Sequence, residues 1–325
     1  MADPYLQPDG LTLVNKLGIT DDPQLLAEME AIHVASRELE IRGLGYPDKH
    51  GVDLLKAIHR HLYQDVYEWA GEFRQVNLSK QAFAQSADAT IFSPASRLNL
   101  ELQKFFQRLT AQDNLRDLPP ALFVDRLAPH FVTLNHIHPF REGNGRTQTL
   151  FWRKIAQDAG HELSFSVISR ERMIAVSIAG ELGNTASVKH MLSDVIHPIR
   201  SAALQRAITF LENARKKGSP VDWQERFIAT TAPGQAYEGQ MIGKSGQEFL
   251  FASSDGLYVG WVGDLPQHGR DLAPGSFITF EASWSSPDID IQPDYGRSAT
   301  VDQRHDRLSA PMQQSSRSGP TPEPD

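Results

Sequence analysis

The sequence predicts a mainly α-helical protein with a short β-hairpin flap, followed by a small β-barrel domain and a disordered tail. The helices are indicated by apolar residues that recur at three- and four-residue spacings through most of residues 23–217. A small β-barrel or sandwich is indicated by short apolar runs, separated by glycines, between Gln235 and Ser283. The tail is indicated by the composition after Trp284, which is rich in Ser, Pro, Asp and Gln.

The helical region is expected to begin at Pro23, because the acidic pair before it suits a helix N-terminus. A second helix is expected in GVDLLKAIHRHLYQDVYEWAGEF, ending near Gly71. The next stretch, FRQVNLSKQAFAQSADATIF, loses the helical period and alternates at VNLSK, which predicts the hairpin or flap. Further helices are expected over residues 94–109, 121–134, 145–158, 170–182 and 186–217.

The predicted domain boundaries follow these changes of pattern. The KKGSP cluster around Gly218 ends the helical period, so residues 1–217 are expected to form the helical domain with a connecting helix. Residues 218–284 are expected to form the β-rich domain, with strands in AYEGQMIG, QEFLFAS, LYVGWV and SFITFEA. Residues 285–325 hold too few apolar side chains to offset the conformational entropy of ordering, which predicts disorder.

Composition argues against several classes of function. The formal net charge of -8 gives no surface suited to many phosphates, so nucleic acid is not an expected partner. Zero cysteines exclude disulfides, thiolate zinc sites and cysteine nucleophiles, and agree with a reducing compartment. No stretch approaches the roughly 18 apolar residues of a membrane span, and the first residues lack a signal-peptide pattern. We therefore expect synthesis in the cytoplasm and no membrane partner.

The stretch HPFREGNGRTQT, from His138 to Thr149, concentrates groups suited to one reaction. The apolar spacing after it predicts a helix that begins near Gly143, whose unpaired N–H groups and positive dipole end favour a phosphate. Arg146 adds a planar cation for phosphate oxygens, and Glu142 supplies the oxygen ligand that Mg²⁺ usually takes beside phosphates. His138 has the near-neutral pKa that suits proton abstraction. The set describes a diphosphate with its metal beside a base.

This stretch resembles the motif of the Fic (filamentation induced by cAMP) family, which reads H-x-F-x-D/E-G-N-G-R-x-x-R. Thr149 occupies the position of the last arginine of the motif. The other defined positions match the motif: His138, Phe140, Glu142, Gly143, Asn144, Gly145 and Arg146. The segments YLQPDGLTLVNKLGITD, HRHLYQDVYEWAGEFRQVNLSK and FVTLNHIHPF also resemble Fic-domain segments. The resemblance covers about residues 3–199 and implies a Fic-type helical domain.

In that family the domain transfers AMP from ATP to a hydroxyl of a target protein and releases pyrophosphate. The resemblance therefore implies a nucleotidyltransferase, a protein adenylyltransferase, with ATP as substrate and Mg²⁺ as cofactor. Its partner would be a target protein that carries a Ser, Thr or Tyr hydroxyl.

The resemblance also assigns roles to residues of the motif and the flap. His138 is the implied general base, Glu142 the metal ligand and Arg146 a phosphate clamp, while Asn144 and the glycine backbone form the anion cradle. The implied nucleotide-binding set is Gly143, Asn144, Gly145, Arg146 and Thr149. The flap resembles the family's hairpin that docks the target by strand addition, through Val76, Asn77, Leu78, Ser79 and Lys80.

The β-rich segment resembles the oligonucleotide-binding (OB) type barrel that follows the Fic domain in bacterial effectors of the Bartonella type. Between Gln235 and Ser283 it holds only two cations, Lys244 and Arg270, so a protein-facing or spacer role is expected rather than nucleic-acid binding. No segment resembles the C-terminal delivery domain of those effectors. The bacterial cytoplasm is the expected location, and secretion into a recipient or host cell is the alternative.

Thr149 leaves a second function open. The alternative is a catalytically weak Fic-fold module that binds nucleotide or protein, or a transferase that uses another nucleotide. Arg153 lies four residues after Thr149 and either reaches back toward the phosphates or is an exposed helix residue. Many Fic proteins carry an inhibitory helix, S/T-x-x-x-E-G/N, and the nearest match here, SRELEI, ends in Ile41. Either a separate small antitoxin supplies that helix or nothing does.

Two other patterns have structural interpretations. The H-x-H pattern of His136 and His138, with His130 nearby, could form a metal site. The alternative is that these histidines have packing or loop positions. GQMIGKSG, at residues 239–246, mimics a Walker A loop but leads into a strand, which predicts a hairpin turn.

Overall fold

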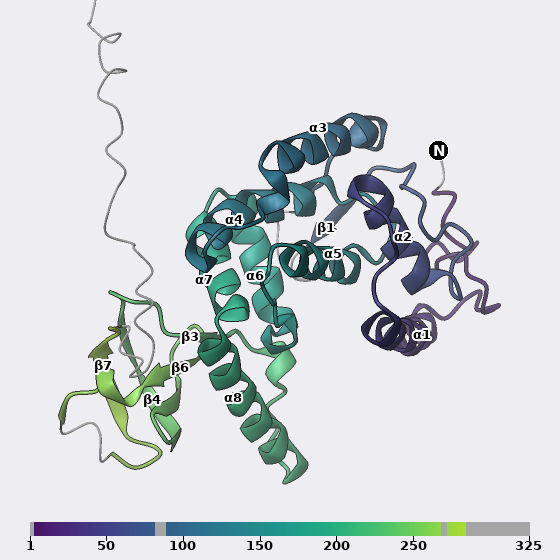
Figure 1. Cartoon of the computed structure of the whole chain (residues 1–325). Helices are drawn as coiled ribbons and strands as arrows, with labels where there is room; N and C mark the ends of the chain where they lie inside the picture. The colour runs from purple at the N-terminus through teal and green to yellow at the C-terminus, as the bar shows by residue number, and fades with distance from the viewer. Residues whose placement is uncertain (1–2, 82–88, 268–271, 284–325) are drawn as a thin grey trace, which may run out of the picture. The chain divides into compact units, whose positions relative to one another are not determined.

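Helices make up most of the computed structural model, which describes residues 3–81, 89–267 and 272–283 (Figure 1). This confirms the mainly α-helical prediction. The helices of this described part are α1 (Pro23–Leu44), α2 (Gly51–Tyr63), α3 (Leu98–Ala111), α4 (Pro120–Ile137), α5 (Asn144–Asp158), α6 (Arg170–Glu181), α7 (Thr185–Ile196) and α8 (Pro198–Lys216).

Helix α1 begins where the sequence predicts, with Pro23 in its first turn and the side chain of Asp22 accepting a hydrogen bond from the Leu25 N–H at 2.9 Å. The predicted helix over residues 186–217 is instead two helices. His197 has an extended backbone and Pro198 starts α8, because a residue before proline is disfavoured in the helical region.

Helix α2 ends at Tyr63, earlier than the predicted end near Gly71. The chain then folds back in turns that bury Val66 and Tyr67. Gly71 has φ +86, and a Cβ there would lie 2.9 Å from the Cβ of Arg60, so this return requires glycine. Apolar spacing alone does not distinguish such buried turns from another helical turn.

The core of the helical part is built around α4 and α5. Helix α4 packs against α3, α5, α6 and α7, and α5 packs against α2. Phe151 and Trp152 of α5 are fully buried, as are Leu127 and Leu134 of α4. Both flanks of the connection between α4 and α5 are therefore held in tightly packed helices, which fixes the motif that lies there.

The predicted hairpin is confirmed. Strand β1 (Ser79–Gln81) pairs antiparallel with β2 (Ala89–Ile91), with Ser79 opposite Ile91. Residues 82–88, between the two strands, lie outside the described residues.

The β-rich region forms an open five-stranded sheet in the described part of the chain, with strand order β3-β6-β5-β4-β7. Strand β3 pairs parallel with β6, and the other neighbours are antiparallel. The end strands β3 and β7 do not pair with each other, so the closed OB-like barrel is not confirmed. The GQMIGKSG stretch forms β4 and the turn into β5, as expected of a hairpin. The strands are β3 (Ile228–Thr230), β4 (Ala236–Ser245), β5 (Glu248–Ala252), β6 (Leu257–Trp261) and β7 (Phe277–Glu281).

The sheet buries its two faces in different ways, which accounts for its open form. One face joins the helical core through Ile228, Leu250 and Val259, and β3 and β6 contact α8 (Figure 1). The opposite face has a core of its own that includes Phe249 and Phe280. Because a helix covers one face, the apolar residues are buried without closing the sheet on itself.

A buried ion cluster joins the helices to the sheet. Asp194 of α7 is fully buried and lies 2.7 Å from Arg172 of α6 and 3.0 Å from Arg200 of α8. The same carboxylate accepts a hydrogen bond from the Thr230 hydroxyl in β3 at 2.6 Å. Burial alone would raise the pKa of Asp194, but Arg172, His190 and Arg200 together lower it.

The division of the chain at residues 217 and 218 stays a prediction. Contacts divide the chain between Pro287 and Asp288, so all described residues belong to one unit. The predicted disordered tail, residues 285–325, lies outside the described residues. None of the described helices is long and apolar enough to cross a bilayer.

Candidate active site

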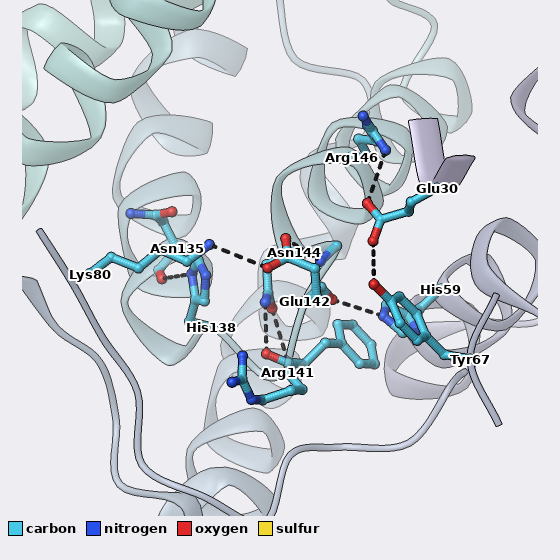
Figure 2. A network of polar contacts seen from close by, with 12 residues as sticks. Glu30, His59, Tyr67, Lys80, Asn135, His138, Arg141, Glu142, Asn144 and Arg146 are labelled. Atoms are coloured by element: carbon cyan, nitrogen blue, oxygen red, sulfur yellow. Dashed lines mark hydrogen bonds and ion pairs between the residues drawn. The ribbon is translucent and has the colours of Figure 1, made fainter. Parts of the chain in front are cut away.

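His138 closes helix α4 in an unusual backbone conformation. It is the C-cap residue, with φ 47 and ψ 61, and its N–H donates to the Leu134 carbonyl at 3.1 Å. The left-handed region is disfavoured for residues other than glycine, so neighbouring contacts must hold the residue there. The turn directs the imidazole toward the start of α5 and the strand of Lys80 (Figure 2).

The imidazole of His138 is neutral, and one of its nitrogens has no hydrogen-bond partner in the described part of the chain. Its Nδ1 lies 3.2 Å from the Asn135 carbonyl oxygen, which can only accept, so Nδ1 carries the proton. Nε2 has no hydrogen-bond partner among the described residues. Burial, with the nearby Lys80 ammonium, lowers the pKa of His138 to about 3. Nε2 therefore presents a lone pair, as a base requires.

The loop between α4 and α5 is braced by Asn144. Its Oδ1 accepts from the Phe140 N–H at 2.9 Å, and its Nδ2 donates to the Phe140 carbonyl at 2.8 Å. The side chain is buried, so in this structure it shapes the loop instead of facing an anion. The predicted contact of Asn144 with the nucleotide is therefore expected from its backbone N–H, and it stays a prediction.

His59 of α2 fixes the same loop from the other side. It accepts from the Gly71 N–H through Nδ1 at 2.8 Å, so Nε2 carries the proton and donates to the Glu142 carbonyl at 3.1 Å (Figure 2). Its ring stacks on Phe140 with centroids 3.8 Å apart. Burial lowers the pKa of His59 to about 3, which keeps this bridge neutral.

The start of α5 is open to an anion. Gly143 is the N-cap with φ 79, and no side chain among the described residues caps the helix. A Cβ at Gly143 would lie 2.3 Å from the Tyr63 ring, so only glycine allows this close approach. Gly145 is exposed in the first turn. The uncapped first turn and the helix dipole together favour a phosphate at this position.

Arg146 points from α5 toward α1. Its Nη1 lies 3.4 Å from Oε1 of Glu30, whose other carboxylate oxygen accepts from the Tyr67 hydroxyl (Figure 2). Burial raises the pKa of Glu30, although the Tyr67 hydrogen bond opposes the rise. The Arg146 side chain stays 45% exposed, so its guanidinium is accessible to a ligand.

Thr149 lines a cavity of about 280 Å³ with residues from α1, α4, α5 and α6. Glu38 of α1 lies in the same lining, and its Oε1 is 3.8 Å from Nη1 of Arg153. Glu38 also pairs with Arg42 at 2.7 Å. Arg153 is therefore an ion-paired residue close to the cavity, and its use in place of the missing arginine stays a prediction.

Glu142 has one carboxylate oxygen bonded to the chain and the other near a cation. Oε1 accepts from the Gly143 N–H at 3.0 Å, and Oε2 lies 4.0 Å from Lys80 Nζ (Figure 2). No cluster of three acidic or histidine ligands occurs in the described residues. A lone, partly exposed carboxylate beside an anion site fits Mg²⁺, which takes its other ligands from phosphates and water.

The H-x-H metal hypothesis has no support in the described part of the chain. His136 pairs through Nδ1 with Glu181 at 2.9 Å. His130 is buried, and its ring meets Phe105 edge-on. The three histidines therefore have separate contacts and do not form a metal-binding cluster among the described residues.

The predicted flap residues form one stem of the hairpin beside the motif. Asn77 Oδ1 accepts from the Ala95 N–H at 2.9 Å, and the Leu78 carbonyl accepts from the Phe92 N–H at 3.2 Å. Val76 precedes them, and Ser79 and Lys80 lie in β1. The structure thus brings this predicted set next to His138 and Glu142.

Three residues near the motif were missed by the sequence analysis. Phe92 follows β2 and stacks on the His138 ring with centroids 3.8 Å apart. Glu30 contacts Arg146, and Arg74 donates to the His138 carbonyl at 2.8 Å. Each is a single residue far from the motif in sequence, so no local spacing marks it. Arg74 and Phe92 lie within the stretch that predicts the flap, and only this position could have drawn attention to them.

Comparison with known proteins agrees with this geometry. The model of the Fic/DOC family matches residues 50–156. A probable protein adenylyltransferase Fic from Escherichia coli (strain K12) is 32% identical over 199 residues, which cover 60% of this chain and 92% of that protein. The chain belongs to the Fic/DOC family.

Two further matches extend beyond the Fic domain. A protein adenylyltransferase of Bartonella henselae (strain ATCC 49882 / DSM 28221 / CCUG 30454 / Houston 1) is 30% identical over 291 residues, or 86% of this chain. The chain spans about half of that relative, 52% of its length. The solved structure of the type IV secretion system effector protein BepA matches with a TM-score of 0.76 at 28% identity, covering 87% of this chain and 97% of that one. This Fic/DOC chain therefore shares the fold of BepA beyond the residues of the family model.

Proposed function

We propose that the chain is a protein adenylyltransferase, which transfers AMP from ATP to a hydroxyl side chain of a target protein. The observation that carries the proposal is the Nε2 atom of neutral His138, which no described residue hydrogen-bonds and which lies in the same motif as the start of α5. The names of the Escherichia coli and Bartonella henselae relatives support the same reaction.

In the proposed reaction, His138 accepts the proton of the target hydroxyl on Nε2 as the hydroxyl oxygen attacks the α-phosphorus of ATP. The bond between that phosphorus and the oxygen bridging to the β-phosphate breaks, and pyrophosphate leaves with those electrons. An anionic triphosphate beside the ring would raise the pKa of His138 from its low value in the free protein, since an opposite charge favours the protonated form. The imidazolium then releases its proton to solvent.

The other motif residues bind and orient the nucleotide in this proposal. Arg146 and the backbone of Gly143, Asn144 and Gly145 hold phosphate oxygens at the start of α5. Thr149 faces the adjoining cavity as a neutral contact. Glu142 would hold Mg²⁺, which supplies positive charge to the phosphates when bound.

The flap supplies the proposed docking site for the target. A target segment would add as a strand to β1, through the backbone of Val76–Lys80, and so present its hydroxyl to His138. Ser, Thr and Tyr hydroxyls all suit this chemistry. A separate small antitoxin with an inhibitory helix remains a proposed partner, since SRELEI in α1 does not complete that motif.

The proposed location is the bacterial cytoplasm, where the bacterial relatives suggest synthesis. The relative BepA is described as a type IV secretion system effector, which supports delivery into another cell as the alternative.

A catalytically weak nucleotide-binding module, or use of another nucleotide, remains the second candidate because the motif ends in Thr149. One experiment separates the candidates: the full chain is incubated with Mg²⁺, bacterial or host lysate, and ATP labelled at either the α- or the γ-phosphate. AMP transfer places only the α-label on protein, and mass spectrometry of the labelled peptides identifies the modified hydroxyl. No protein label with any of ATP, GTP, CTP and UTP, despite measurable nucleotide binding, would favour the binding module.

A further inference from the structure

The Arg74 guanidinium connects the flap to the end of α4. It donates to four backbone carbonyl oxygens and is almost fully buried. Two of these oxygens belong to the flap stems: Val76 at 2.7 Å before β1, and Ser93 after β2. The other two belong to the end of α4: Ile137 at 3.1 Å and His138 at 2.8 Å. One side chain therefore joins the segments that carry the proposed target dock and the proposed base.

The backbone of Arg74 adds a further bond to the same turn. Its N–H donates to the Pro139 carbonyl at 2.9 Å. The carbonyls of Ile137, His138 and Pro139 are thus all tied to this one residue. His138 sits in the disfavoured left-handed region, and such a conformation persists only where surrounding contacts over-determine it.

Burying the Arg74 guanidinium costs free energy, because the charge is removed from water. No carboxylate hydrogen-bonds its guanidinium in the described residues, and burial lowers its pKa, although the nearby Glu101 carboxylate opposes that fall. A buried cation is costly unless it is paired and hydrogen-bonded, and here only carbonyl dipoles are in hydrogen-bonding contact. The rigid fork of arginine reaches four acceptors at once, which a lysine ammonium with three donors does not.

We propose that Arg74 is a positioning residue for the proposed AMP transfer, which sets the His138 imidazole and the flap in one fixed register. A target strand docked on the flap then brings its hydroxyl within reach of Nε2. The inference rests on the proposed function, because it assigns Arg74 a role in that reaction. Arg74 touches neither nucleotide nor target in this role.

The test compares kinetic and binding constants of full-length Arg74→Lys and Arg74→Gln with the wild type. We expect both variants to bind Mg²⁺ with a non-hydrolysable ATP analogue within about threefold of the wild type, because Arg74 does not face the start of α5. Pyrophosphate release from Mg²⁺ and ATP, with AMP passing to a hydroxyl of the chain itself or to water, should lose about a hundredfold in kcat, since small misplacements of reacting groups cost that much. Turnover within threefold of the wild type, or an equal loss of analogue binding, would overturn the proposal.

Arg172→Lys is the matched control. Arg172 is equally buried but belongs to the Asp194 cluster between α6 and α7. We expect this control to lower the unfolding temperature while keeping kcat within threefold. A hundredfold loss in this control as well would mean that any buried arginine is required, and would overturn the specific role of Arg74.

A second measurement does not depend on turnover. The charged groups around the His138 ring are Lys80 of β1 and Arg74, and both oppose its protonation. Nitrogen-15 NMR of the imidazoles, assigned with His138→Ala, should show an altered His138 tautomer or a raised pKa in Arg74→Gln and no change in Arg172→Lys. If the wild type binds nucleotide but releases no pyrophosphate, the proposed function fails and this NMR comparison alone decides whether Arg74 positions His138. An unchanged His138 signal would overturn that too.

Discussion

Two buried clusters of histidine and arginine differ in whether a carboxylate completes them. Between the helices and the sheet, Asp194 bonds both Arg172 and Arg200, and all three are almost inaccessible to solvent. Beside the motif, Arg74 and His138 have no carboxylate hydrogen-bonded to them in the described residues, and Nε2 of His138 has no partner. The first arrangement is that of a structural joint. The second has no carboxylate hydrogen-bonded to it in the described residues and belongs to the same motif region as the partly exposed Arg146, as a site for an anionic ligand requires.

The largest expected effect comes from a change in the cluster of Arg74 and His138. His138→Ala should lower AMP transfer by roughly 10²- to 10⁴-fold, because the base acts only on the proton of the attacking hydroxyl. Nucleotide binding and the cooperative unfolding transition should remain. Label transfer by the variant and the wild type, measured under one set of conditions, checks this. Transfer at the wild-type rate would remove His138 from the mechanism.

A change in the cluster of Asp194, Arg172 and Arg200 should lower the stability of the fold instead of the rate of AMP transfer. Asp194→Ala leaves Arg172 and Arg200 buried without their carboxylate, which should lower the free energy of unfolding by about 3–5 kcal/mol. Urea unfolding of the full chain measures this. Below its unfolding midpoint the folded variant should keep the wild-type kcat. A loss of kcat in fully folded protein would show that the two clusters are coupled.

The Thr149 position should give a tenfold to hundredfold effect on nucleotide use. Thr149→Arg adds a charge-assisted phosphate contact worth roughly 1.5–3 kcal/mol, so it should increase ATP-dependent transfer. Arg153→Ala should lower transfer only when residue 149 is threonine, if Arg153 leaves Glu38 to reach the phosphates. Rates with ATP, GTP, CTP and UTP for both single variants, the double variant and the wild type test this cycle. Equal rates in all four proteins would mean that other groups hold the outer phosphates.

The smallest predicted effect is the pH dependence of stability contributed by His138. Its pKa is about 3 in the folded chain and about 6.5 when unfolded, so the unfolded chain binds more protons below pH 6.5. This destabilises the fold as the pH falls. Between pH 7 and pH 5 the wild type should therefore lose about 2 kcal/mol more than His138→Ala. Urea unfolding of both proteins at the two pH values measures the difference, and parallel losses would show that the ring is not buried as neutral imidazole.

Local sequence was sufficient for features that depend on neighbouring residues. The start of α5, the glycine-lined turn and the placement of His138, Glu142 and Arg146 all follow from spacing within one short stretch. The hairpin was predictable because its alternation differs from the helical period around it. Each of these features depends on residues that are close together in the sequence, so it could be predicted without knowing which segments pack against each other.

Features set by distant contacts were not predictable from spacing. Arg74, Glu30 and Phe92 reach the motif only because tertiary packing brings their segments to it. The expected closed barrel was not confirmed, since strand patterns do not reveal that α8 covers one face of the sheet. In each case the outcome depends on what lies across the core.

The core that α8 shares with the sheet has a consequence for how the protein is made. Leu204, Ile208 and Leu211 of α8 are buried in the same cluster as Val259 and Trp261, which are synthesised later. At about 5–20 residues per second, the ribosome takes a few seconds to add the segment between them. During that interval the nascent chain carries an apolar helix without its cover. Only after β6 has been made, has left the ribosome and has paired in the sheet is this face of α8 covered.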